Sequence, residues 1–219
     1  MASVLFLNIK GVFPNAVMDQ LLHNMKKCHL PSEIISFTQH MLEDRKTKLR
    51  FDDFKSDWFP IKNGIGQGDP LSMLLYVIYN SDLMDIAKKE KGELALAFVD
   101  NTTLVIVGNM FKDNHRRLKN MMERRGGGYE WSKNHNSCFK TNKFMLMDFS
   151  LNRSKNRLDM TLRGITIKSS ATHKFLRLIL NNEQLWKAHT AHATAKGASY
   201  TILLHRLLSS TWGIPAKLI

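Results

Sequence analysis

The sequence NGIGQGDPLS, residues 63–72, combines a glycine-rich loop with the start of a helix. Its three glycines predict a loop, Asp69 is suited to cap a helix, and Pro70 suits the first helical turn. The apolar positions that follow predict a helix that continues to about residue 89. A capped helix start needs neither three closely spaced glycines nor Gln67. The loop is therefore expected to have a binding role as well as a structural one.

Upstream of this loop the pattern predicts one strand, two helices and a pair of short strands. An apolar run at residues 4–9, broken only by Asn8, is typical of a buried strand. Pro14 and Asn15 are expected to end that strand and to cap the first helix. The remaining elements are expected in this order: a second helix from Pro31-Ser32, then strands at 47–51 and 58–61 around a polar turn.

Downstream of the loop the pattern predicts a β-hairpin, a basic helix and several shorter elements. Asp100-Asn101 is a natural two-residue turn between two apolar strands. The expected elements are strands at 94–99 and 102–107, a basic amphipathic helix at 111–124, a strand at 143–149, a polar linker at 152–157, a hairpin around Gly164, a strand at 175–180 and a helix at 184–208. This order predicts an α+β fold, with helices packed on one face of a mainly antiparallel sheet.

The composition indicates a polyanionic partner without deciding it. The chain has 219 residues and a formal net charge of +13. Such an excess fits a nucleic-acid partner as well as it fits an unrelated basic protein. The two cysteines show no zinc or disulfide spacing, no secretory signal is evident, and the longest apolar run, residues 73–79, is too short to span a bilayer. We expect a soluble intracellular protein, nuclear or cytoplasmic, with no membrane partner.

Three segments, in order and spacing, resemble the catalytic motifs of reverse transcriptases. They are LFLNIKGVFPNA at 5–16, GIGQGDPLS at 64–72 and AFVDN at 97–101. WSKNH at 131–135 is similar to the non-LTR retrotransposon branch, of fungal type. The resemblance implies a polymerase palm core at 1–150, an RRM-like antiparallel sheet with helices on one face. It implies that 151–219 form the palm end, a small primer-grip-like hairpin and the start of a helical thumb. The fingers, most of the thumb and any endonuclease would be missing.

The resemblance also implies a two-metal catalytic site, and here the sequence departs from the family. Two divalent ions roughly 4 Å apart promote phosphoryl transfer, and Mg²⁺ prefers carboxylate oxygens. The family's metal carboxylates correspond to Asn8, Asp100 and Asn101, of which only Asp100 is acidic. An amide supplies no net charge, so each replacement should cost several kcal/mol at an effective dielectric of about 20. A loss of only ~4 kcal/mol slows a reaction about a thousandfold. The resemblance therefore predicts a Mg²⁺ site that is damaged and an enzyme that is inactive.

Other roles also follow from the resemblance, with RNA template, DNA primer and dNTP as the implied partners. Phe13 would exclude a ribonucleotide 2′-hydroxyl, and Lys143 would donate a proton to pyrophosphate. The remaining implied residues are Gly66, Gln67 and Gly68 at the nucleotide and template, and Phe175, Leu176 and Arg177 in the primer-grip-like hairpin. Plainer interpretations remain open: a core phenylalanine, a solvated lysine, and for the helix at 111–124 a solvated basic face. Without the resemblance, Asn8 would be an ordinary strand residue and Asp100-Asn101 an ordinary turn.

The departures from the family pattern share one direction. Asn8 and Asn101 stand where the family has aspartate, and Arg177 stands where it usually has glycine. Each change follows from one G-to-A change in the coding strand, and each makes the chain more positive. We therefore expect a degenerate, truncated retrotransposon copy that decayed by cytosine deamination. Two alternatives are a non-catalytic nucleic-acid-binding remnant and a product without function.

Overall fold

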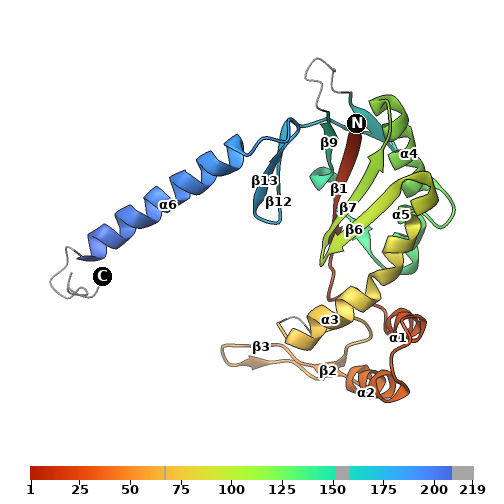
Figure 1. The fold of residues 1–219 in the computed structure, drawn as a ribbon. Helices are drawn as coiled ribbons and strands as arrows, with labels where there is room; N and C mark the ends of the chain where they lie inside the picture. Colours follow the sequence, from red (N-terminus) through yellow and green to blue (C-terminus); the bar gives the residue numbers. More distant parts are fainter. Residues whose placement is uncertain (67, 151–157, 209–219) are drawn as a thin grey trace.

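The computed structural model describes residues 1–66, 68–150 and 158–208. Its centre is an antiparallel sheet in the order β6-β7-β1, and β9 and β8 pair in turn with the other edge of β1. Figure 1 shows these strands side by side, with α4 and α5 beside the sheet. The strands of the sheet are β1 (Ala2–Lys10), β6 (Glu93–Phe98), β7 (Asn101–Val107), β8 (Cys138–Phe139) and β9 (Met145–Phe149).

The central strand β1 is buried on both faces, which explains its continuous apolar sequence. Leu5, Leu7 and Ile9 point to one side and join the main core. Val4 and Phe6 point to the other side, into a smaller cluster. Since side chains alternate along a strand, Asn8 shares the face of Val4 and Phe6. The predicted buried strand is confirmed.

Helix α4 packs on the central sheet, whereas α1 packs against α2 and α3. On the sheet, α4 packs through Leu118, Met121 and Met122, which are fully buried. No helix among the described residues is long and apolar enough to cross a membrane. The helices are α1 (Met18–Lys27), α2 (Ser32–Leu42), α3 (Pro70–Tyr79), α4 (Phe111–Glu123), α5 (Gly128–Asn134), α6 (Lys187–Leu208) and the short 3₁₀ helices η1 (Ser81–Ile86), η2 (Lys89–Lys91) and η3 (Thr141–Lys143).

Two helix boundaries differ from the sequence prediction. The helix that begins at Pro70 ends at Tyr79, and the chain continues as η1 and η2 where a single helix to about 89 was expected. The turn lets Asp82 in η1 reach Trp131 and His135 in and beside α5. Asn15 does not cap α1, which begins after Val17 without a side-chain cap. Instead, the backbone N–H of Asn15 donates to Gly11 O at 3.0 Å and closes the loop after β1.

The segment between α2 and the glycine-rich loop forms a two-stranded ribbon. β2 (Lys46–Thr47) pairs with β5 (Phe59–Pro60), and β3 (Arg50–Phe51) pairs with β4 (Phe54–Lys55). The two strands expected around a polar turn are thus four short ones. Figure 1 shows this ribbon extending beside α3, away from the central sheet.

Two hairpins and a projecting helix complete the described chain. β10 (Met160–Leu162) pairs with β11 (Ile165–Ile167), as predicted around Gly164. The single strand expected at 175–180 is instead a hairpin of β12 (Thr172–Phe175) and β13 (Leu178–Asn181), because Leu176 and Arg177 form a turn. Figure 1 shows α6 extending from this hairpin away from the sheet. The linker predicted at 152–157 lies outside the described residues.

Candidate functional site

The candidate site lies where the β6–β7 hairpin meets the end of β1. Asn101 pairs with Phe98 across the hairpin and with Asn8 on β1, so it belongs to β7. The Ile9 amide also donates to Asp100 O at 2.8 Å. The turn is therefore Val99-Asp100, one residue earlier than the predicted Asp100-Asn101. This register is set by the pairing of β7 with β1, which cannot be predicted from the local sequence of the hairpin.

The first residue of that turn has an unusual backbone conformation. Val99 has φ of 53°, in the left-handed region that β-branched residues avoid. Such a conformation costs on the order of 1–3 kcal/mol and persists only where its surroundings enforce it. Here the β1–β7 ladder holds the hairpin tip against Asn8. The strain is thus located at the residue next to Asp100.

The side chains of Asn8, Asp100 and Asn101 form one hydrogen-bonded group. Asn8 Nδ2 donates to Asp100 Oδ2 at 2.8 Å, and Asn101 Nδ2 donates to Asp100 Oδ1 at 3.2 Å. Asn8 Oδ1 is buried and has no hydrogen-bond partner among the described residues. Both oxygens of the lone carboxylate therefore accept amide hydrogens.

This set of donors does not fit a pair of divalent cations. The described residues contain no group of three or more histidine, cysteine, aspartate or glutamate side chains that could hold a metal ion. The site itself offers one carboxylate, and its lone pairs face the N–H groups of two amides. Mg²⁺ needs several oxygen ligands in octahedral geometry. A cation at Asp100 would have to compete with these two amide donors for the carboxylate oxygens, and neither Asn8 nor Asn101 would add negative charge to the site.

The glycine-rich loop is held directly against the loop that follows β1. Gly64 N donates to Ala16 O at 2.7 Å, and Ile65 N donates to Phe13 O at 2.8 Å. Gly64 has φ of 97°, and a Cβ there would lie 2.9 Å from Pro14 O. Glycine is thus required at Gly64 by conformation and by space. This contact brings the first two motifs of the sequence together.

The rest of the loop is exposed, and one arginine supports its start. Gly66 and Gly68 are exposed, and Gly68 has φ of 94° with open space around its Cβ position. Gln67 lies outside the described residues. Arg45 donates to Gly64 O at 2.6 Å and to Leu42 O at 3.0 Å, and burial lowers the pKa of its guanidinium. This role of Arg45 has no signal in the sequence, since its partners are backbone oxygens.

Beneath Phe13 lies a buried tyrosine that the sequence prediction missed. Phe13 is half-buried, and its ring centroid lies 5.6 Å from that of Tyr76. The Tyr76 hydroxyl is buried without a hydrogen-bond partner among the described residues. Burial raises the pKa of Tyr76, and the charges of Tyr79 and Asp100 raise it further. Tyr76 is thus a neutral hydroxyl close enough to Asp100 to be influenced by its carboxylate.

The other predicted residues surround the same end of β1. Lys143 is exposed in η3, which is tied to β1 because Lys140 N donates to Asn8 O at 2.8 Å. The Lys143 ammonium forms no ion pair within the described residues, which leaves it solvated. The β12–β13 hairpin lies on the sheet face that carries Asn8, with the Phe175 ring 5.1 Å from Phe6. Leu176 and Arg177 are exposed at its tip, and both have positive φ, 46° and 70°.

Trp131 and His135, the first and last residues of the WSKNH segment, are buried and belong to a hydrogen-bonded network with Asp82. Trp131 Nε1 donates to Asp82 Oδ1 at 2.8 Å, and His135 Nε2 lies 3.0 Å from Asp82 Oδ2. Tyr79 donates to His135 O at 2.6 Å, and burial raises the pKa of Tyr79 to about 12. Burial opposes ionisation of Asp82, but the hydrogen bonds from His135 and Trp131 outweigh it, so the pKa of Asp82 lies below its usual value. The network braces η1 against α5.

The basic residues of α4 are mostly engaged within the protein. Arg124 donates to both carboxylate oxygens of Glu93, at 3.0 and 2.6 Å, and Arg117 donates to Val107 O at 3.2 Å. Arg116 lies 3.0 Å from the Asp113 carboxylate. These contacts favour the interpretation that the basic face of this helix is solvated and paired within the protein, rather than the interpretation that it binds phosphates.

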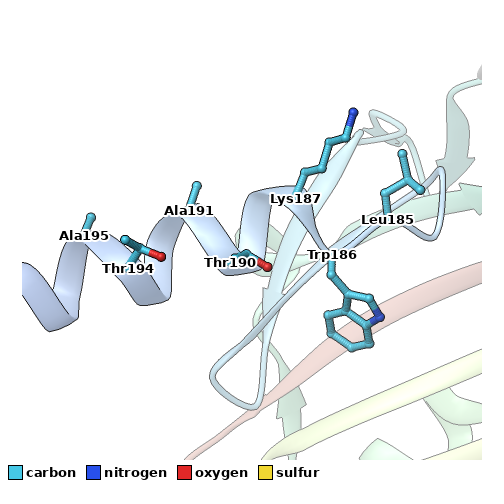
Figure 2. A pocket seen from close by; sticks show the side chains of 7 residues that line it. All are labelled: Leu185, Trp186, Lys187, Thr190, Ala191, Thr194 and Ala195. Carbon is cyan, nitrogen blue, oxygen red and sulfur yellow. The ribbon is translucent and has the colours of Figure 1, made fainter.

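A shallow hollow at the start of α6 shows no comparable chemistry. It measures about 730 Å³, and its lining is largely apolar. Figure 2 shows Trp186 and Lys187 pointing to opposite sides of the helix start. Among the residues that line the hollow, Lys187 has the one ionisable side chain. The Asn8–Asp100 group remains the better candidate site.

Comparison with known proteins shows what the whole chain is similar to. No family model matches the chain. Among curated proteins, the chain is similar to the RNA-directed DNA polymerase from mobile element jockey of Drosophila melanogaster, with 23% identity over 187 residues. That match covers 84% of this chain and 20% of the relative.

Solved structures of telomerase show the same arrangement of elements. Apo telomerase from Candida tropicalis has a TM-score of 0.55 at 14% identity, over 76% of this chain and 31% of that one. Its form truncated from the C-terminal domain has a TM-score of 0.54 at 16% identity, over 82% and 35%. The fold of this chain is therefore similar to that of the matched part of these telomerase chains. The chain spans about a fifth of the mobile-element polymerase and about a third of these telomerase chains.

Proposed function

We propose that this chain is part of the RNA-directed DNA polymerase of a non-LTR retrotransposon, and that its own catalytic site is inactive. Residues 1–150 are its palm core, and 151–219 are the palm end, the primer-grip-like hairpin and the start of a thumb helix. The sequence similarity to the jockey polymerase and the fold shared with telomerase support the polymerase origin. RNA template, DNA primer, dNTP and Mg²⁺ are the partners of the intact ancestor.

The observation that carries the inactivity proposal is the hydrogen bonding of Asp100. Its two carboxylate oxygens accept from Asn8 and Asn101. In a two-metal mechanism the cations would compete with these amide donors for the carboxylate oxygens. Hydrogen bonds to a charged group contribute about 1.5–3 kcal/mol each, so losing either one would be costly. The weakened site lacks the charge that would offset this cost.

We propose that the remaining site residues take the roles that the resemblance to reverse transcriptases implies. Phe13 and the loop of Gly66, Gln67 and Gly68 would border the nucleotide, with the loop held in place by the Gly64 contacts. Lys143 would act as the proton donor near the end of β1. Phe175, Leu176 and Arg177 would face the primer from the sheet side that carries Asn8. Within the described site, the departures from the family pattern are the lost charge at Asn8 and Asn101 and the replacement of glycine by Arg177 in the hairpin turn.

The second candidate function is a non-catalytic nucleic-acid-binding remnant, and the net charge of +13 favours it. The third interpretation, a product without function, draws on strain at Val99 and Arg177, whose φ angles are 53° and 70°. The hydrogen-bonded networks of the half-buried Asp82 and the buried Glu93 argue for a chain that folds nonetheless. The proposed origin, a degenerate fungal retrotransposon copy, is tested by sequencing the sister copies of the element. Asparagine at positions 8 and 101 in those copies, without a G-to-A bias at silent sites, would refute it.

One set of variants tests the proposal. The unaltered chain, Asn8→Asp, Asn101→Asp and the double variant are assayed for Mn²⁺ binding by calorimetry and for primer extension with an RNA template, dNTP and Mg²⁺. We expect no metal binding and no extension by the unaltered chain, and metal binding by the double variant. The control adds Asp100→Asn to the double variant and should abolish that binding. Extension by the unaltered chain would contradict the inactivity proposal.

A further inference from the structure

The β2–β5 ribbon has two chemically different faces. Residues paired across an antiparallel ribbon point to the same side, and neighbours along a strand point to opposite sides. The pairs Arg50–Lys55 and Phe51–Phe54 therefore occupy opposite faces. The apolar face consists of Leu49, Phe51, Phe54 and Phe59, and the basic face consists of Lys46, Lys48, Arg50, Lys55 and Trp58.

The cations of the basic face are exposed and free. Lys46, Lys48, Arg50 and Lys55 are all exposed, and none forms an ion pair within the described residues. Arg50 and Lys55 lie directly opposite each other across the ribbon. Like charges in that position destabilise a strand pair. An anionic ligand would offset this repulsion, since no carboxylate of the described residues forms an ion pair with Arg50 or Lys55.

Trp58 adds an aromatic surface to this group of cations. Its side chain is 63% exposed, which is unusual for a large aromatic residue. Lys48 Nζ lies 4.8 Å from the centre of the Trp58 ring, so the ring belongs to the basic face. A flat aromatic ring beside free cations is the combination that binds single-stranded nucleic acid. Bases stack on the ring, and phosphates contact the cations.

We propose that the basic face of the ribbon is a binding site for single-stranded nucleic acid, separate from the Asn8–Asp100 site. Trp58 stacks on a base, and Lys46, Lys48, Arg50 and Lys55 contact successive phosphates. Binding at this face requires no metal ion, no dNTP and no catalysis, so it does not depend on the proposed polymerase function. It differs from α4, where the arginines are paired with carboxylates or backbone oxygens.

The charge of the basic face and its single aromatic ring favour nucleic acid over protein as the ligand. Protein-binding surfaces are depleted of lysine at their centres, whereas lysine is three of the four cations here. The apolar face is the part of the ribbon that would suit a protein or a second copy of this chain. Asp57, which precedes Trp58, is the acidic residue next to the stacking surface. Its removal should therefore strengthen binding.

The experiment measures binding of a fluorescent 20-nucleotide oligo(U) by the full chain in EDTA, by anisotropy over a range of salt concentrations. Trp58→Ala should weaken binding about tenfold through loss of stacking. The combined variant Lys46→Gln/Lys48→Gln/Arg50→Gln should reduce the slope of log K against log salt by about 2, since each phosphate contact contributes about 0.7. Asp57→Asn should tighten binding. The matched control, Lys112→Gln/Arg116→Gln/Lys119→Gln on α4, removes equal charge and should lower the slope by less than 1.

Each outcome decides the proposal. Circular dichroism verifies that every variant is folded, which is expected because all the changed side chains are exposed. An unchanged affinity and slope in both ribbon variants would overturn the proposal, as would an equal loss in the α4 control. Concentration-dependent dimerisation that Phe51→Ser abolishes, with no effect of the ribbon variants on oligo(U), would assign the ribbon to a protein contact instead. Failure of metal binding or extension in the Asn8 variants leaves this assay unaffected.

Discussion

Replacing Asn8 with aspartate tests how the site is held together without metal. In the present structure Asn8 Nδ2 lies 2.8 Å from Asp100 Oδ2 and donates a hydrogen bond to it. Asn8→Asp puts a second carboxylate at this position. Two charges about 4 Å apart repel by roughly 4 kcal/mol at an effective dielectric of 20, and the lost hydrogen bond adds about 1.5–3 kcal/mol.

The expected destabilisation is smaller than that sum, because the two carboxylates can share a proton. We expect the free energy of unfolding to fall by about 3–5 kcal/mol at pH 8 in EDTA, and Tm by about 10 °C, since ~1 kcal/mol corresponds to roughly 2–4 °C in a chain of this size. The shared proton raises a carboxyl pKa in the folded state. The loss should therefore be largest at high pH and shrink as the pH falls toward 5.

Metal and a matched variant complete the test. Mn²⁺ at a hundred times its dissociation constant should restore about 2.7 kcal/mol to Asn8→Asp and nothing to the unaltered chain. The exchanged pair Asn8→Asp/Asp100→Asn keeps one carboxylate and one amide, so its stability should be close to that of the unaltered chain. Thermal and urea unfolding measure both. If Asn8→Asp is as stable as the parent in EDTA, or if the exchanged pair loses as much as the single variant, the charge argument is wrong.

Three further predictions concern the turns and the buried network. Arg177 and Gly164 occupy left-handed positions in two hairpins, with φ of 70° and 80°, so Arg177→Gly should raise the free energy of unfolding in urea by about 1 kcal/mol and Gly164→Ala should lower it by about as much. Gly64→Ala should cost more than Gly68→Ala by ~1–3 kcal/mol in the same assay, because the first Cβ meets Pro14 O at 2.9 Å and the second meets nothing. The pKa of Asp82 is lower in the folded state than in the unfolded state, so ionised Asp82 stabilises the fold above the unfolded-state pKa of about 3.9, and this stabilisation is lost as the pH falls through the folded-state pKa. Asp82→Asn should remove this acid sensitivity from the free energy of unfolding. An unchanged dependence of stability on pH would refute the role of Asp82.

Much of the fold could be predicted because the local signals are strong. The buried strand β1, the capped start of α3 at Asp69 and the amphipathic helix α4 lie where the apolar periods placed them. The errors occurred where a distant partner overrides the local pattern. The helix after Pro70 ends early so that Asp82 can reach Trp131. The turn at Asp100 shifts by one residue because Asn101 pairs with Asn8.

The sequence by itself determined the chemistry available at the site. Residue identity alone shows that one carboxylate remains among Asn8, Asp100 and Asn101, because charge needs no coordinates. The tertiary structure decided how these residues act on one another. Antiparallel pairing of β1 and β7 places Asn8 opposite Asn101, so the amides donate to both oxygens of Asp100. A linear pattern cannot encode this contact, since it depends on strand register between segments more than ninety residues apart.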